Sequence, residues 1–142
     1  MQGTLRAFRE AGIDIDPSHI IEEQLSVEGG RQGLTKILEF KKRPTVIIFG
    51  NDAQAIGAIA KSRELGIKIP EEISVTGFDD IELASLVDPP LTTNKVPINE
   101  IGIRAAEMIV QMINGEIDET SNAANDVLPT LVIERQSLRN IT

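Results

Sequence analysis

Two adjacent carboxylates, Asp79 and Asp80, directly follow a short apolar segment of the chain. A pair of prolines, Pro89 and Pro90, then leads into a second extended segment that begins at Leu91. In an open parallel sheet, side chains just past the carboxyl ends of strands point into the ligand crevice. Carboxylates in that position accept hydrogen bonds from hydroxyl groups or bind cations. The pattern therefore predicts a polar binding site at one edge of a sheet.

Apolar residues alternate between helical and extended spacing along the chain. The spacing predicts helices within residues 5–11, 27–38, 53–65 and 97–114, and strands at 45–49, 73–78, 91–96 and 131–133. Segment 45–49 is a continuous run of β-branched and aromatic residues with apolar side chains on both faces, which predicts a strand buried on both faces. Ser26 is the expected N-cap of the second helix. The alternation predicts an α/β fold, with an open parallel sheet flanked by helices.

Composition narrows the possible functions. A length of 142 residues suggests one domain, and the absence of cysteine excludes disulfides, thiolate metal sites and cysteine catalysis. The net charge of −8 at pH 7 and the lack of a basic stripe argue against nucleic-acid contact by these residues. No apolar run approaches the roughly 20 residues that span a bilayer. The polar start shows no signal peptide, so we expect a cytoplasmic protein that contacts no membrane.

Several motifs, taken together, resemble the LacI/GalR family of repressors. They occur in the family's order over nearly the whole chain, at Ala11–Ile13, Glu28–Gly30, Pro44–Asp52, Ile73–Asp80, Pro89–Thr93 and Leu131–Ser137. The resemblance implies a periplasmic binding protein-like fold, of which this chain would be the truncated C-terminal lobe. The DNA-binding headpiece and nearly all of the first lobe would be absent, so DNA contact would need that missing headpiece.

The resemblance also divides the chain. Residues 1–95 and 127–142 would form the lobe, while residues 96–126 would be a crossover helix and loop that pack on the missing lobe. We expect helix 97–114 to pack instead on this chain or on another copy, as in domain swapping. With one wall of the cleft missing, we expect this chain alone to bind a ligand weakly.

The resemblance assigns roles to residues at the predicted edge. Asn51 and Asp79 match residues that contact the effector, while the alternatives are a helix cap for Asn51 and a turn cap for Asp79. Val27 matches a position that is often aromatic and stacks on the ligand, so valine departs from the family pattern. A cap is the favoured role for Asp80, and a capping or structural role for Asp52.

Two further residues match the dimer face of relatives. These are Ile56 on the third helix and Val87 just before the proline pair. Ordinary core packing explains the same apolar spacing equally well. The resemblance nevertheless implies a homodimer.

The leading functional hypothesis is the effector-sensing and dimerisation portion of a repressor that binds a sugar or similar small metabolite. The alternative is a solute-binding protein of a sugar transporter, which would share the fold. The third hypothesis is a phosphoacceptor or an enzyme. A receiver domain is loosely resembled by the set of Asp79, Asp80, Thr92 and Lys95, but the order of these residues along the chain does not fit that domain. The single histidine offers no catalytic triad. We expect no catalysis, no cofactor and no metal site.

Overall fold

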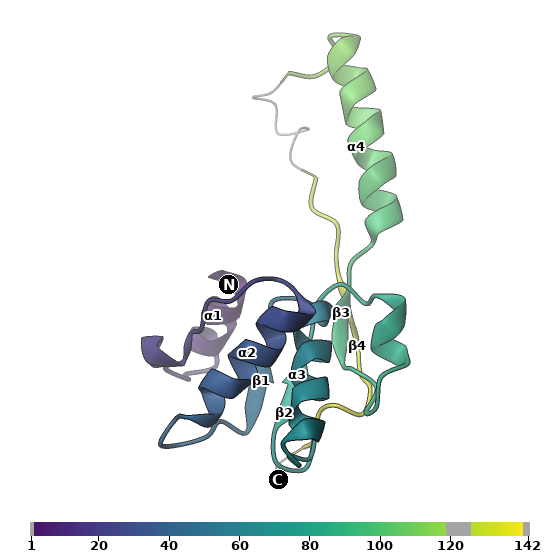
Figure 1. The fold of residues 1–142 in the computed structure, drawn as a ribbon. Coiled ribbons are helices and arrows are strands. Elements are labelled where there is room, and N and C mark those ends of the chain that lie inside the picture. The colour runs from purple at the N-terminus through teal and green to yellow at the C-terminus, as the bar shows by residue number, and fades with distance from the viewer. Residues whose placement is uncertain (1, 119–125, 141–142) are drawn as a thin grey trace.

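The computed structural model describes residues 2–118 and 126–140 of the chain. Its centre is a small sheet covered by two neighbouring helices, α2 (Val27–Leu38) and α3 (Asp52–Glu64) (Figure 1). Strands β1 (Val46–Ile48) and β2 (Ser74–Thr76) lie behind these helices and run parallel to each other. Since α3 connects β1 to β2, the centre of the molecule is a strand–helix–strand crossover.

Two further strands extend the sheet. β3 (Thr93–Lys95) adjoins β2 through isolated parallel bridges that join Thr76 to Thr92 and Asp79 to Lys95. β4 (Leu131–Ile133) pairs with β3 in the antiparallel direction. The strands thus form two two-stranded sheets, β1–β2 and β3–β4, which the isolated bridges join in the order β1-β2-β3-β4. The predicted α/β fold with a parallel sheet is confirmed, and the reversed last strand is a feature that periodicity did not reveal.

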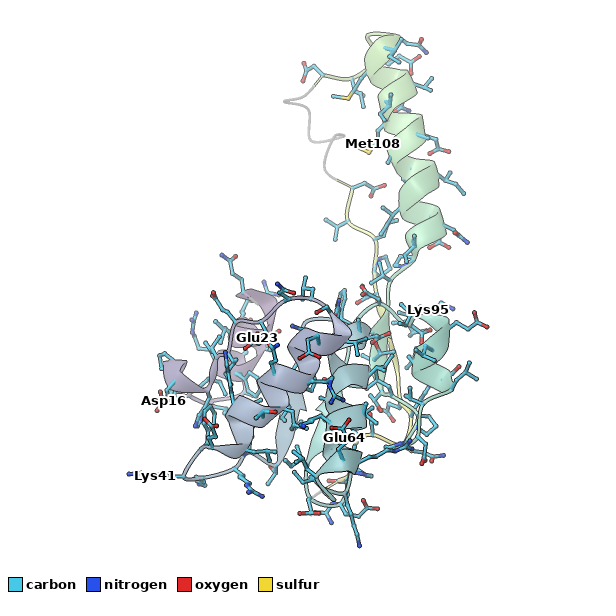
Figure 2. All side chains as sticks on the ribbon, in the orientation of Figure 1. Asp16, Glu23, Lys41, Glu64, Lys95 and Met108 are labelled. Carbon is cyan, nitrogen blue, oxygen red and sulfur yellow. The ribbon has the colours of Figure 1, made fainter. Side chains whose placement is uncertain are left out.

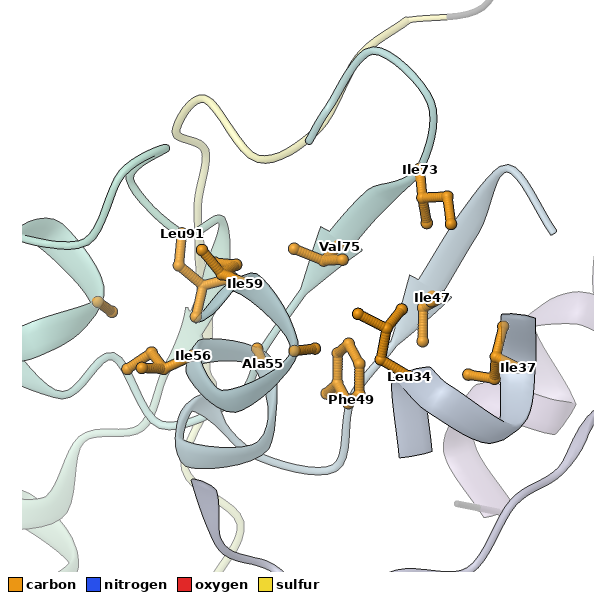
Figure 3. Close-up of a cluster of buried hydrophobic side chains, with 12 residues drawn as sticks. Leu34, Ile37, Ile47, Phe49, Ala55, Ile56, Ile59, Ile73, Val75 and Leu91 are labelled. Carbon is orange, nitrogen blue, oxygen red and sulfur yellow. The ribbon is translucent and has the colours of Figure 1, made fainter. Parts of the chain in front are cut away.

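The hydrophobic core lies between the two helices and the sheet (Figure 3). Its buried side chains are mostly aliphatic, since the chain has only four phenylalanines and neither tryptophan nor tyrosine. They are Leu34, Ile37, Ile47, Phe49, Ala55, Ile56, Ala58, Ile59, Ile73, Val75, Ala84 and Leu91. This layer fixes the helices against the strands whose ends carry the candidate site.

β1 is buried on one face only. Ile47 and the following Phe49 belong to the core, whereas Val46 and Ile48 are 41% and 48% exposed. The prediction of burial on both faces is therefore wrong. The physical reason is that α2 and α3 cover one side of the strand, while the side chains on the other side keep almost half of their surface open.

Close contact between α2 and α3 depends on glycine. A Cβ atom on Gly30 would collide with the carbonyl group of Gln54, and one on Gly57 would collide with the carbonyl group of Val27. Backbone therefore meets backbone across this helix pair, which only a residue without a Cβ atom permits. Ser26 caps α2 as predicted, because its hydroxyl oxygen accepts a hydrogen bond from the amide of Gly29 at 3.1 Å.

Smaller elements surround this centre. α1 (Gln2–Glu10) ends just before Gly12, whose φ of 70° is a left-handed stop. Two short 3₁₀ helices follow, η1 (Pro17–His19) and η2 (Glu82–Ser85). After β4 the chain returns beside β2, where the amide of Val75 donates to the carbonyl of Ser137 at 2.9 Å. The returning segment thus joins β2 to Thr92, the residue that leads into β3.

α4 (Ile98–Ile113) projects away from the rest of the chain (Figures 1 and 2). It contains no buried residue, although much of its surface is apolar. The expectation that this helix packs back on its own chain is wrong, and packing on another copy stays a prediction. Within residues 2–118 and 126–140, no helix has the length and apolar content needed to cross a bilayer.

Candidate functional site

The candidate site lies at the carboxyl ends of β1, β2 and β3. Three backbone hydrogen bonds join the chain beyond these strands, each with a donor–acceptor distance of 2.9 Å. They run from the amide of Phe49 to the carbonyl of Thr76, from Asp52 to Phe78, and from Asp79 to Asn94. The ladder therefore brings Asn51, which precedes Asp52, and Asp79 to the same edge of the sheet, as the sequence predicts.

Asn51 is the N-cap of α3. Its side-chain oxygen accepts a hydrogen bond from the amide of Gln54 at 2.9 Å, and its side-chain nitrogen donates to the carbonyl of Leu25 at 3.4 Å. The capping role is confirmed. Capping uses one lone pair of the amide oxygen, and the residue is only half-buried, so the side chain keeps capacity for a ligand.

Asp52 is fully buried and joins three parts of the site. Its carboxylate accepts hydrogen bonds from the amide of Ile81 at 2.9 Å and from the hydroxyl of Thr93. A Cβ atom on Gly77 would collide with the same carboxylate, so the turn after β2 needs glycine there. The predicted structural role of Asp52 is confirmed: it ties the start of α3 to the turn after β2 and to β3.

Asp79 has the least satisfied side chain of the site. Its carboxylate is half-buried, and no hydrogen bond or ion pair within residues 2–118 and 126–140 reaches it. Burial, and secondarily the negative charge of Asp52, raise the pKa of the Asp79 carboxyl above its ordinary value. The predicted turn-capping alternative for Asp79 has no hydrogen bond to support it.

The backbone at Asp79 and Asp80 is strained. Their φ angles are 119° and 58°, in the region that favours glycine. Such conformations cost of order 1–3 kcal/mol each and persist where the surrounding structure holds them. Here the amide of Asp79 is bound to Asn94, and the amide of Ile81 is bound to Asp52.

The favoured capping role of Asp80 is wrong. The residue at the N-cap of η2 is Ile81, and no side chain caps that helix. Asp80 instead forms an ion pair with Arg135 at 2.7 Å, with the side chains 12% and 19% exposed respectively. Arg135 lies 55 residues away in the sequence, so local spacing gave no signal for this pair. Arg135 is therefore the residue next to the candidate site that the sequence analysis did not predict.

The other predicted residues have different surroundings. Val27 is the first residue of α2 and is 47% exposed, and its carbonyl lies against Gly57 of α3. Ile56 belongs to the core, and Val87 packs partly buried against that core. Core packing therefore accounts for both in a single chain, and their role in a dimer stays a prediction.

Two hollows of the surface lie away from this edge. One, of about 390 Å³, is near the end of α3 and includes Arg63, Lys68 and Asp88 in its lining. The other, of about 400 Å³, is at the base of α4, where Lys95 is labelled in Figure 2. Asn51 and Asp79 line neither of them. Asn51 and Asp79 thus belong to an edge of the sheet that lies outside both of these hollows.

Comparison with known proteins identifies the family. The model of the periplasmic binding protein-like domain matches residues 1–138. This chain belongs to that family. The transcriptional repressor CytR of Escherichia coli K12 is 34% identical to this chain over 116 aligned residues. The alignment covers 82% of this chain and 34% of CytR. The ribose operon repressor of Haemophilus influenzae is 34% identical over 141 residues, 99% of this chain and 42% of the repressor.

A solved structure agrees with these relatives. A sugar-binding transcriptional regulator of the LacI family from Escherichia coli, complexed with phosphate, superposes with a TM-score of 0.82. It is 29% identical, over 96% of this chain and 48% of its own. The periplasmic binding protein-like chain spans less than half the length of each of these proteins. The resemblance to LacI-family regulators that the motifs carry is confirmed.

Proposed function

We propose that this chain is the effector-sensing and dimerising portion of a LacI-family transcriptional repressor, with a sugar or similar small metabolite as its effector. The relatives that support this are named as repressors, one of a ribose operon, and a solved neighbour is described as sugar-binding. These names favour a regulator over the solute-binding protein of a transporter. A cytoplasmic protein without catalytic activity is part of the same proposal.

The observation that carries the proposal is the free carboxylate of Asp79. It sits in strained backbone at the edge where three strands end, half-buried and with no partner in the described chain. A carboxylate accepts hydrogen bonds from two adjacent hydroxyls, and charge-assisted bonds of this kind are strong. Asn51 would add an amide from the neighbouring strand end, and Val27 an aliphatic contact at the margin.

Repression would then depend on a population shift. An effector that binds the site more tightly in one arrangement of the protein favours that arrangement, and only by the difference between its two affinities. The negative charge of this chain repels phosphate backbones, so DNA contact would belong to a different part of the repressor. This chain would contribute the sensing surface and a contact between two copies.

The test is a thermal-shift screen followed by calorimetry. D-ribose, other pentoses and hexoses, sugar phosphates and nucleosides are added to this chain and to a longer product that contains it. We expect binding to be weak for this chain and stronger for the longer product. In the longer product, Asp79→Ala should weaken binding about 10- to 100-fold, from the loss of about 1.5–3 kcal/mol per charged hydrogen bond.

Asp14→Asn is the matched control, since Asp14 is an exposed aspartate in the loop after α1. It should leave affinity unchanged. Equal binding by the Asp79→Ala variant would show that the site is elsewhere. Failure of every metabolite to bind either product would contradict the sensing function.

A further inference from the structure

Arg135 connects three segments around the candidate site. Its guanidinium donates to the carboxylate of Asp80 at 2.7 Å and to the carbonyl of Leu91 at 2.8 Å, while its own amide donates to the hydroxyl of Thr92 at 2.9 Å. The side chain is mostly buried, so this is no loose surface pair. A planar guanidinium that binds two acceptors at once fixes their relative position.

Asp80 depends on this contact. In the described chain, Arg135 is its one side-chain partner. Asp80 also shares the strained turn with Asp79, and both φ angles are positive. The turn is therefore held by the backbone hydrogen bond from Asp79 to Asn94, by the hydrogen bond from Ile81 to Asp52, and by the ion pair of Arg135 with Asp80.

We propose that Arg135 is a positioning residue of the effector site: by holding Asp80, it keeps the neighbouring Asp79 carboxylate fixed at the edge of the sheet. The inference rests on the proposed function, because it takes Asp79 as the ligand-binding carboxylate. Arg135 itself need not touch the effector. Without it, the strained turn loses its one side-chain anchor from the segment after β4, and Asp79 is held less firmly.

The charges around Asp79 give this arrangement a second consequence. Asp52 at the start of α3 and Asp80 in the turn are negative, Arg135 after β4 is positive, and Lys95 is the bridge partner of Asp79 on β3, with an exposed side chain. Arg135 neutralises Asp80. If the guanidinium is removed, an unpaired carboxylate is left beside Asp79 and disfavours its ionisation.

The experiment uses the protein without a ligand, so a failed effector screen and a failed positioning role are distinguishable. Amide hydrogen exchange is measured by NMR in wild type and in Arg135→Met. We expect several-fold faster exchange at the Asp79 amide, which bonds to Asn94, and no change at the Phe49 amide, which bonds to Thr76. A purely structural role would accelerate both amides together.

The titration of the Asp79 carboxyl, followed by carbon NMR, is the second measurement. Arg135→Met should raise the pKa of Asp79, and Asp80→Asn added to that variant should remove the rise, a non-additive result that places the effect in the pair. Arg135→Lys should restore part of the wild-type behaviour. Arg139→Met, an exposed arginine on the same segment, is the control and should change neither reading.

The outcomes decide the proposal. Unchanged exchange and titration of Asp79 in a folded Arg135→Met variant would overturn it, and so would a rise in pKa that survives Asp80→Asn. If Arg135→Met does not fold, Asp80→Asn alone carries the test. That variant leaves the guanidinium unpaired beside Asp79, so it should lower the pKa of the Asp79 carboxyl. It should also make exchange of the Asp79 amide faster. No change in the pKa or in the exchange rate would overturn the proposal.

Discussion

At the scale of single residues, the site combines strain with an unmet hydrogen-bonding capacity. Asp79 and Asp80 both adopt positive φ angles, which aspartate, with its short polar side chain, adopts more often than most residues. Asp80 is partnered by Arg135, and Asp79 is not partnered in the described chain. The molecule thus maintains a strained turn that carries one carboxylate without a hydrogen-bond partner in the described chain.

Replacing Asp79 by asparagine should stabilise the protein at neutral pH. The folded pKa of this carboxyl is raised, first by burial and then by Asp52, above the ordinary value of 3.8. Its contribution to stability is therefore fully present below 3.8 and is lost as the pH rises through the folded pKa. Asparagine has the same shape and tolerance of positive φ but no charge.

Urea unfolding across the acid-to-neutral range checks this prediction. The stability of Asp79→Asn relative to wild type should increase as the pH rises, and ligand binding should be lost. Asp14→Asn, which removes an exposed charge, is the control. A stability difference that stays constant with pH would show that Asp79 ionises as freely in the folded chain as in the unfolded chain.

Sequence reasoning succeeded for residues whose partners are local. Ser26 and Asn51 cap helices through amides three residues ahead, a distance that the sequence displays directly. It failed for Asp80, whose partner Arg135 lies 55 residues away. A turn cap is the local option for an aspartate after a strand, and only the folded chain reveals the competing ion pair.

At the scale of elements, direct backbone contact at two glycines, Gly30 and Gly57, lets α2 and α3 approach closely. The apolar periodicity of the sequence predicted α2 and α3 and their apolar faces. It did not reveal that glycines of both helices form the contact between them. Helical spacing does not report how closely two helices approach. The two-faced burial predicted for β1 failed for a similar reason, because apolar content does not show which faces other elements cover.

Gly57→Ala tests the backbone contact. The new Cβ atom would collide with the carbonyl of Val27, so α2 and α3 must separate, and we expect a loss of about 1–3 kcal/mol in the free energy of unfolding. Denaturant unfolding measures this loss. Gly102→Ala in α4, where a Cβ atom meets open space, is the control and should be neutral or slightly stabilising.

Ser137→Ala tests how the returning segment joins β2 to β3. The buried hydroxyl accepts from the amide of Thr92 at 2.8 Å and donates to the carbonyl of Val75 at 2.7 Å. Its removal leaves both groups buried without partners, at a cost of about 1–3 kcal/mol. The urea midpoint should fall for Ser137→Ala and barely move for Ser85→Ala, whose hydroxyl is exposed in η2. Equal midpoints would contradict this role.

At the scale of the whole molecule, the packed lobe and the projecting α4 have opposite characters. The lobe buries its apolar residues between helices and sheet, whereas α4 leaves its isoleucines, Val110 and Met112 exposed (Figure 2). Periodicity predicted the helix correctly. It could not predict where the helix would lie, since an amphipathic pattern specifies a buried face but not the surface that buries it.

We expect the chain to self-associate through α4. Exposed apolar surface of this extent is relieved by contact between copies. Replacing Ile101 and Met112 together by glutamate should weaken association, as measured by sedimentation velocity over a range of concentrations. Gln111→Glu adds a charge without removing an apolar group and is the control. A wild-type chain that stays monomeric at high concentration would contradict the prediction.

The buried position of Ser137 has a consequence for biosynthesis. All the strands of this chain leave the ribosome before Ser137 does, yet its side chain and carbonyl are needed to join two of them. A nascent polypeptide that stops short of this residue carries its helices and strands but leaves a seam between β2 and β3. In such a product the amide of Thr92 and the carbonyl of Val75 have no hydroxyl partner, so this part of the lobe closes only after Ser137 has been added.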